Sequence, residues 1–415
     1  MSRTVTAPLS APTTAPADRA APATAATRSP LGLIFLSVFL DALAFATVFP
    51  MLPLYAQGFG AGPEAVTALV AVYSLMQFAL APWWGRLSDR VGRRPVLLAG
   101  TLGAALSFLG FGIAGSLAVL FVARALNGAV GASVGVAQAY IADVTTPERR
   151  ARGMGLVGAA FALAFVVGPA LGGALTRLGP AAPFYAGAGI ALANLLLQLT
   201  VLPESLPPAE RRAPPGAGIR AGLRALRDAD AGLKALYATL FLGTAGLAAM
   251  EATLALWARA RWELTQEMVG YGFAMMGAVA AIAQGGLVGV LVRRLGERRT
   301  ALLGFALIVA SMLALAAAPT LALAAAALAA FAFGRGTMLP PVAAMMSHHG
   351  GGALGQGRIF GASASVSSLA RVLGALASGV LYARLGMEAP YLATAVLALG
   401  AAALLLPGPR WRAAP

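Results

Sequence analysis

Five charged side chains lie well inside long apolar runs of this sequence. They comprise two carboxylates and three guanidinium groups: Asp41, Glu251, Arg124, Arg335 and Arg371. A charge at the centre of a bilayer costs about 2.5–3.5 kcal/mol on insertion scales, so such residues are functional candidates by default. A buried carboxylate can exchange a proton, and a nearby arginine changes its proton affinity. The pattern therefore predicts proton coupling or substrate binding by these five residues, and the alternative is a set of structural ion pairs.

The depth of each charge along its run suggests which of them meet. At 1.5 Å per residue, Asp41 lies roughly 15 Å from one face and Arg124 about 10 Å from the other. In a ~30 Å layer these depths differ by only about 5 Å, so we expect Arg124 to stabilise ionised Asp41. Glu251 lies about 27 Å along its run and Arg371 roughly 20 Å along its own, so we expect Arg371 within reach of Glu251.

Two amides in the same runs, Asn127 and Gln138, are candidates either for substrate contact or for tying helices together. The only histidines, His348 and His349, fall in a predicted loop, and the chain has no cysteine. No Gly-rich nucleotide loop is present. The sequence therefore predicts no metal, no cofactor and no enzymatic site, with a proton gradient as the energy source.

The elements that position these charges are membrane helices. The chain of 415 residues is 59% hydrophobic and only 11% charged, too little charge to cover a soluble surface. Its apolar runs are each long enough to cross a bilayer. We therefore predict an all-α membrane protein with twelve transmembrane helices, at 31–56, 64–84, 95–115, 117–141, 153–176, 183–202, 233–257, 268–291, 300–318, 320–346, 358–382 and 388–407.

The distribution of the 30 Lys and Arg residues predicts the orientation. With the N-terminus inside, only Arg177, Arg259, Arg261 and Arg384 fall in outside loops, so both termini are expected in the cytoplasm of an inner-membrane protein. The net charge of +15 lies between the apolar runs and forms no basic domain, which argues against nucleic-acid binding. We expect a disordered cytoplasmic tail, a first bundle, a cytoplasmic linker, a second bundle and a cytoplasmic tail, at residues 1–30, 31–202, 203–232, 233–407 and 408–415.

An internal repeat relates the two predicted bundles. Four residues of the segment after the second run, Gly85, Arg90, Gly92 and Arg94, recur at the same spacing as Gly289, Arg294, Gly296 and Arg298. Further matches in register link the first run to the seventh and the fifth to the eleventh. Two homologous six-helix halves around a midplane site are an architecture of secondary transporters.

With these residues in view, the chain from residue 31 to residue 407 resembles the major facilitator superfamily. The segment Gly85-Arg-Leu-Ser-Asp-Arg-Val-Gly-Arg-Arg-Pro95 matches that family's signature loop almost completely. Arg124-Ala-Leu-Asn-Gly128 resembles its Arg-x-x-x-Gly motif in helix four. The resemblance implies two pseudo-symmetric six-helix bundles that transport a small molecule by alternating access.

Two further segments resemble antiporters. Helix five resembles the antiporter motif through Gly155, Gly168, Pro169, Gly172 and Gly173, with Ala164 in place of one expected glycine. Leu40-Asp41, followed by Pro50 and Pro53, resembles helix one of drug:proton antiporters, including tetracycline efflux proteins. Tetracycline exporters carry further acidic residues in helices three and nine, whereas 95–115 and 300–318 contain none. The resemblance therefore implies a proton-coupled exporter of amphipathic drug-like molecules and leaves the substrate open.

The signature loop is expected to control access. Gly85 and Gly92 allow tight turns and close helix approach. By resemblance, Asp89 would brace the outward-open state against helix eleven, and Arg90 or Arg94 would engage Asp143 below helix four. The alternative is that Arg90, Arg93 and Arg94 serve only to fix the topology.

Other functions stay open at this point. A symporter or uniporter of a nutrient or metabolite fits the same fold, and the imperfect helix-five motif only favours antiport. A membrane-embedded enzyme lacks a catalytic arrangement. A non-transporting receptor or scaffold has no need of midspan charges. The expected partners are the lipid bilayer, a small-molecule substrate and protons, and we expect a monomer.

Overall fold

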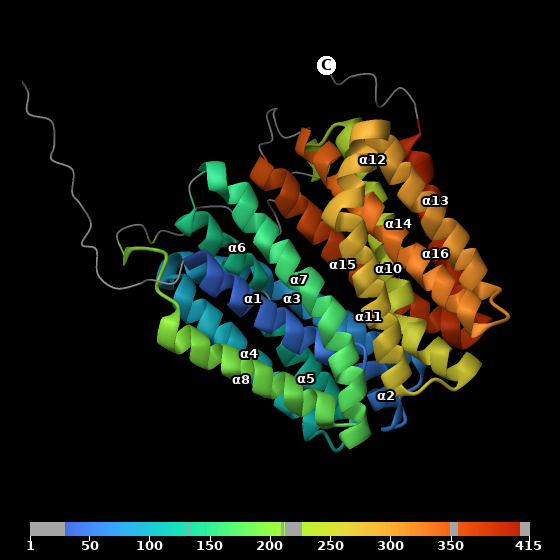
Figure 1. Cartoon of the computed structure of the whole chain (residues 1–415), viewed down its shortest axis with the longest axis horizontal. Helices are drawn as coiled ribbons and strands as arrows, with labels where there is room; N and C mark the ends of the chain where they lie inside the picture. Colours follow the sequence, from blue (N-terminus) through green and yellow to red (C-terminus); the bar gives the residue numbers. More distant parts are fainter. Residues whose placement is uncertain are drawn as a thin grey trace, which may run out of the picture.

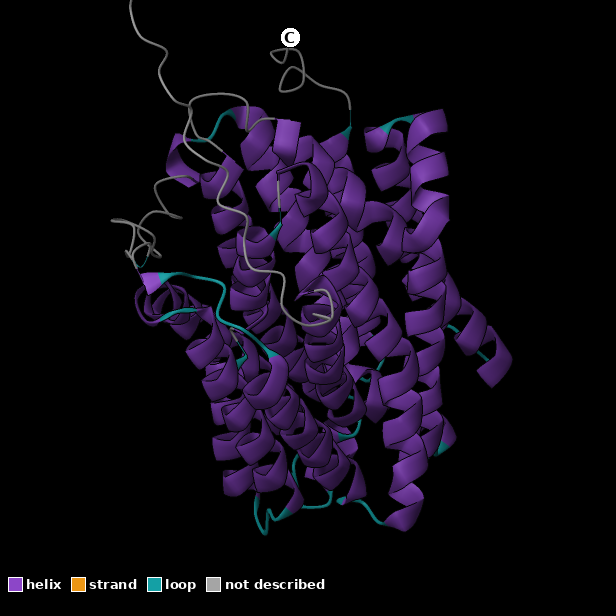
Figure 2. Cartoon of the chain, turned by 60° about the vertical axis from the view of Figure 1, so that its left-hand side comes forward, coloured by secondary structure: helices purple, strands orange, loops and turns teal. Residues whose placement is uncertain are grey.

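The computed structural model describes residues 30–131, 133–145, 147–208, 211, 226–348 and 356–406, and every regular element in this part of the chain is a helix (Figure 2). The predicted tails and most of the predicted linker lie outside the described residues. Eleven described helical stretches are long and apolar enough to cross a membrane, and Ala389–Leu405 is a shorter apolar helix. The prediction of an all-α membrane fold is confirmed.

Two of the predicted runs in the first bundle are broken. The first forms α1 and α2, because Pro50 disfavours a helical residue before it. The fourth forms α5 and α6, with Gly131 after the end of α5. The first-bundle helices are α1 Pro30–Val48, α2 Leu52–Gln57, α3 Pro63–Val91, α4 Arg93–Gly112, α5 Leu117–Val130, α6 Ser133–Val144, α7 Pro147–Leu175 and α8 Ala182–Val201, and a 3-10 turn, Thr176–Leu178, follows α7.

The second bundle repeats this plan with one irregularity. The eighth predicted run is two α-helices joined by a π-helical turn, Ala283–Leu287. The second-bundle helices are α10 Ala231–Trp262, α11 Gln266–Ile282, α12 Val288–Leu295, α13 Glu297–Ala316, α14 Leu321–His348, α15 Gln356–Leu385 and α16 Ala389–Leu405.

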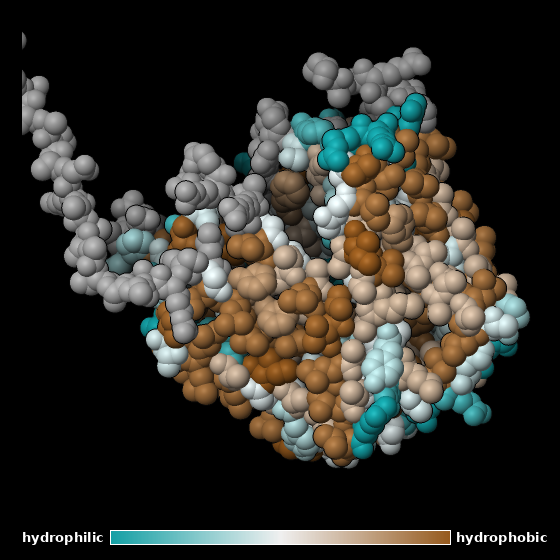
Figure 3. Space-filling view, viewed as in Figure 1, coloured by the Kyte–Doolittle hydropathy of each residue, from teal (hydrophilic) through white to brown (hydrophobic). Residues whose placement is uncertain are grey.

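The outer surface of both bundles is apolar, as lipid contact requires. Figure 3 shows hydrophobic residues over most of the visible face, and Val122, Leu196 and Val396 are among those exposed. Inside, each bundle has its own core, with Phe108 and Phe184 in the first and Phe305 and Phe331 in the second. Each bundle is therefore packed internally by apolar contacts and faces outward with apolar side chains.

The two bundles touch at one end and diverge toward the other (Figure 1). At the first, which we call the closed end, lie residues 58–62, 176–181 and 263–265. There Leu54 packs in the second core and Leu256 in the first, and Arg177 forms an ion pair of 2.5 Å with Glu267 across the interface. At the other, which we call the open end, lie the α3–α4 and α12–α13 turns (Figure 1), and Figure 3 shows a hollow between the bundles. A site between the bundles is therefore reached from the open end.

Candidate functional site

A cavity of about 430 Å³ lies between the bundles and contains all five predicted charges. Helices α1, α3, α4, α5, α7 and α8 supply residues on the first-bundle side, and α10, α14 and α15 supply those on the second-bundle side. The residues that matter to its chemistry are Asp41, Phe45, Phe49, Tyr73, Arg124, Asn127, Phe161, Phe165, Glu251, Arg335 and Arg371. Gln138 is not among the lining residues: it lies exposed on α6.

The first-bundle wall is aromatic. The Phe45 ring lies 5.4 Å from that of Tyr73, 5.5 Å from that of Phe49 and 6.4 Å from that of Phe165, measured between ring centroids. Phe49 also meets Phe273 of α11 edge-on at 6.1 Å. These contacts join side chains of α1, α3 and α7 into a continuous apolar surface suited to a flat ligand.

Asp41 is held by neutral hydrogen-bond donors. Its Oδ1 accepts a hydrogen bond of 2.8 Å from Asn194 Nδ2 and one of 3.4 Å from the Thr101 hydroxyl. Gln198 lies behind them and donates from Nε2 to Ser37 Oγ at 2.8 Å and to Thr101 Oγ1 at 3.0 Å. Because both donors reach Oδ1, Oδ2 is the oxygen left to take up a proton. Asn194 was not among the predicted site residues, although a polar residue one turn before Gln198 in an apolar run points to such a role.

Arg124 does not pair with Asp41 in this conformation. Its side chain is only 1% exposed, its Nε donates to the Leu69 carbonyl oxygen at 3.2 Å, and its guanidinium lies 4.6 Å from the Tyr73 ring centroid. Its Nη1 is buried without a hydrogen-bond partner. The expected direct contact is therefore absent here, because α5 turns this side chain toward α3, which approaches closely at Gly128.

Glu251 pairs with Arg335. Arg371 lies in the same cavity and within electrostatic range of Glu251, as its depth predicted, but it makes no ion pair with that carboxylate. Arg335 Nη1 lies 3.2 Å from Glu251 Oε1. Arg371 faces this pair and Tyr73, and it makes no hydrogen bond or ion pair with any described residue. Depth along the helices placed Arg371 near Glu251, but the directions in which α10 and α14 face bring Arg335 into contact with it. Asn127 lines the cavity and donates to Ser107 Oγ at 2.9 Å.

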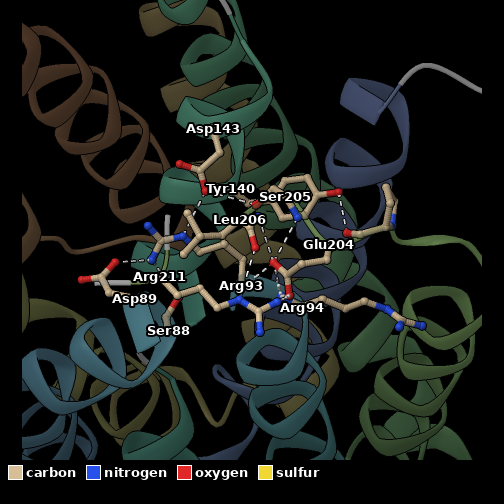
Figure 4. A network of polar contacts seen from close by, with 11 residues as sticks. Ser88, Asp89, Arg93, Arg94, Tyr140, Asp143, Glu204, Ser205, Leu206 and Arg211 are labelled. Carbon is tan, nitrogen blue, oxygen red and sulfur yellow. Dashed lines mark hydrogen bonds and ion pairs between the residues drawn. The ribbon is translucent and has the colours of Figure 1, made fainter. Parts of the chain in front are cut away.

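The signature loop is organised around Arg93 (Figure 4). Arg93 Nη1 lies 2.5 Å from Asp89 Oδ1, and its Nε lies 3.0 Å from Asp143 Oδ2. The expected pairing of Asp143 with Arg90 or Arg94 is therefore wrong: Arg90 is exposed, and Arg94 donates to the Leu199 carbonyl oxygen at 2.7 Å. Since the bundles are apart at this end, the brace between Asp89 and α15 stays a prediction for the opposite conformation.

Glu204, at the start of the predicted linker, completes this network. Its Oε1 accepts hydrogen bonds from the backbone N–H groups of Arg93 at 2.8 Å, Ser205 at 3.0 Å and Leu206 at 3.1 Å. A carboxylate is favoured at a helix N-terminus, here that of α4. Gly92 has φ of 108°, and a Cβ at this position would lie only 2.3 Å from Glu204 Oε2. The absence of a side chain at Gly92 therefore lets the carboxylate come close to the start of α4. Gly85 has no such role: nothing lies within 4 Å of the Cβ position.

The glycines of the helix-five motif have two different neighbours. Cβ atoms at Gly168 and Gly172 would meet α1, the second at 2.1 Å from the Thr47 carbonyl oxygen. A Cβ at Gly173 would lie 2.8 Å from the Glu267 carbonyl oxygen of the other bundle. Pro169 lies within α7, and its carbonyl oxygen faces Gly270. The motif therefore packs α7 against α1 and seals the closed end against α11, while Gly155 meets nothing within 4 Å.

Comparison with known proteins matches both the sequence and the fold. The profile of the Major Facilitator Superfamily matches residues 34–356. The class G tetracycline resistance protein of Vibrio anguillarum is 34% identical over 361 residues, covering 86% of this chain and 91% of that protein. Multidrug resistance protein 2 of Bacillus subtilis is 27% identical over 367 residues, covering 87% of this chain and 90% of that protein.

Solved structures agree. The crystal structure of the human organic anion transporter MFSD10 superposes with a TM-score of 0.70 at 26% identity, covering 91% of this chain and 99% of that one. The nucleoside transporter NupG superposes with a TM-score of 0.73 at 11% identity, covering 91% and 98%, which shows the fold alone. These relatives are transporters and not enzymes, as the sequence predicted.

Proposed function

Because the chain belongs to the Major Facilitator Superfamily, and is therefore a multi-pass membrane transporter, we propose that it exports amphipathic small molecules in exchange for protons. The observation that carries this proposal is the cavity between the bundles, where an exchangeable carboxylate, Asp41, lies beside an aromatic wall. The similarity to tetracycline and multidrug resistance proteins supports drug-like substrates.

Asp41 is the better of the two cavity carboxylates for exchanging a proton. Glu251 already forms an ion pair with Arg335 across 3.2 Å. Asp41 has only neutral donors, and its Oδ2 makes no hydrogen bond with a described residue. A proton on Asp41 is therefore exchanged against a substrate group without breaking an ion pair.

The positive-inside rule supports the orientation in this proposal. The open end carries the turns that contain Arg90, Arg93, Arg94, Arg293, Arg294 and Arg298. Lys and Arg concentrate in cytoplasmic loops, so the open end faces the cytoplasm of a bacterial inner membrane. In this state the substrate enters from the cytoplasm and displaces the proton of Asp41. Separation of α7 from α11 at the closed end then releases the substrate outside, where Asp41 is protonated again.

The test is flux into proteoliposomes with tetracycline and ethidium as probes. We expect the wild-type protein to move at least one probe against its gradient when protons flow the other way. Asp41→Asn should lose this uphill flux while it remains folded. Asp228→Asn, on the exposed segment before α10, is the matched control and should behave as the wild type.

Three results contradict the proposal. Uphill flux at the wild-type rate in Asp41→Asn removes Asp41 as the proton carrier. Flux of a probe in the same direction as the protons identifies a symporter, and flux that is indifferent to the proton gradient identifies a uniporter.

A further inference from the structure

Two opposite charges of the cavity have no ion-pair partner among the described residues. Asp41 lies on α1 of the first bundle, and Arg371 lies on α15 of the second. The remaining carboxylate and its arginine, Glu251 and Arg335, neutralise each other. Apart from Arg124, the cavity therefore presents one charge of each sign without an ion pair, on opposite walls.

Arg124 does not present a third binding charge in this conformation. Its guanidinium lies against Tyr73 and the Leu69 carbonyl oxygen, and its unpartnered Nη1 is buried and not exposed to the cavity. Arg371, in contrast, has an exposed side chain although protein surrounds it, because it opens onto the cavity. An anionic group entering from the open end therefore reaches Arg371.

The space between Asp41 and Arg371 is apolar on the first-bundle side. Phe45, Phe49 and Phe165 form part of the aromatic surface there, and the volume of about 430 Å³ is that of a small-molecule pocket. A ligand with a flat aromatic body buries its apolar surface against this wall.

We propose that the cavity selects aromatic zwitterions, which place a basic group on Asp41 and an acidic group on Arg371. A ligand with a single charge leaves the other protein charge without a partner in an enclosed site, where unpaired charges are costly. The inference rests on the proposed function, because the basic group takes the place of the proton on Asp41. The other ionisable groups facing the cavity are Tyr73, Glu251, Arg124 and Arg335, and the last three are already engaged or paired.

The test uses matched probes on one skeleton, in a naphthalene and a biphenyl series. Each series has three members: an aminomethyl cation, a carboxylate anion, and the zwitterion that carries both groups. Binding to purified protein is measured by calorimetry at one pH. We expect at least one zwitterion to bind about tenfold or more tightly than both of its singly charged counterparts.

Variants assign each end. Arg371→Gln should abolish the preference for the zwitterion over the cation, and Arg371→Lys should retain part of it. Asp41→Asn should abolish the preference for the zwitterion over the anion. Arg384→Gln, on the same helix as Arg371 but exposed and outside the cavity, should retain the full preference.

The outcomes separate this inference from the proposed function. A singly charged probe that binds as tightly as both zwitterions overturns the inference, and so does an unchanged preference in Arg371→Gln. If a proton gradient drives flux of tetracycline or ethidium but no zwitterion is preferred, the proposed export function is supported and the proposed substrate class is refuted. If zwitterions are preferred but no probe is transported in response to the gradient, the proposed substrate class is supported and proton coupling is refuted.

Discussion

Substitution of Gly270 by alanine should open the closed end. A Cβ at Gly270 of α11 would lie 2.5 Å from the Pro169 carbonyl oxygen of α7, on the other bundle. This is roughly 1 Å short of ordinary contact, and backbone atoms of two packed helices yield only by moving apart. Overpacking of this kind costs about 1–3 kcal/mol. Since the cost falls only on the state in which α7 and α11 touch, the equilibrium should shift about 5- to 150-fold toward the opposite state.

The absence of cysteine makes this shift measurable with pairs of spin labels. Exposed positions Leu178 and Met268 report on the closed end, and Val91 and Leu295 report on the open end. We expect Gly270→Ala to lengthen the distances of the first pair and shorten those of the second.

The matched control is Gly272→Ala, on the same helix, where nothing lies within 4 Å of the added Cβ. It should leave both distance distributions unchanged. If Gly270→Ala also leaves them unchanged while the protein remains folded, the contact between α7 and α11 does not hold the closed end, and the reasoning is wrong.

Two further predictions concern charged side chains in the cavity and at the open end. Arg124→Lys should keep part of the proton-driven flux and Arg124→Ala should lose nearly all of it, because lysine keeps the charge above Tyr73 but not the planar set of donors. Flux across a pH series checks this, and a wild-type profile in Arg124→Ala contradicts it. Glu204→Gln should lower the thermal unfolding midpoint in detergent by roughly 2–4 °C, because the α4 N-terminus loses a charged acceptor. Glu64→Gln, on the first turn of α3, is the comparison variant, and an equal fall in both would contradict a specific role for Glu204.

The sequence predicted which residues would gather in the cavity better than it predicted their partners. The free-energy cost of placing a charge inside a bilayer was enough to identify the five cavity charges, because a charge in an apolar run needs a polar cavity or a partner. These are Asp41, Arg124, Glu251, Arg335 and Arg371. Depth along a run is a one-dimensional quantity, whereas a contact also depends on the direction in which each helix faces. Because of the directions in which the helices face, Glu251 forms its ion pair with Arg335, and Arg124 points toward α3.

The signature loop illustrates the same limit. The resemblance placed Asp143 beside this loop but assigned it to Arg90 or Arg94. Neighbouring arginines at the start of a helix point about 100° apart, and a motif match does not tell which of them faces Asp143. Glu204 went unnoticed because it lies in a Pro-rich segment that reads as a linker. Its role depends on four backbone N–H groups, and backbone groups leave no trace in a residue pattern.

The π-helical turn at Ala283–Leu287 bears on the register between the two halves. The stretch Pro63–Val91 has 29 residues, and its counterpart Gln266–Leu295 has 30. Both end at a glycine with positive φ, Gly92 and Gly296. In a regular helix one extra residue would rotate everything beyond it by about 100° and turn the following arginines toward lipid. A π turn takes up that residue locally. The π turn therefore lets the arginine-rich turn of the second half keep the orientation of its counterpart in the first half, although its helix is one residue longer.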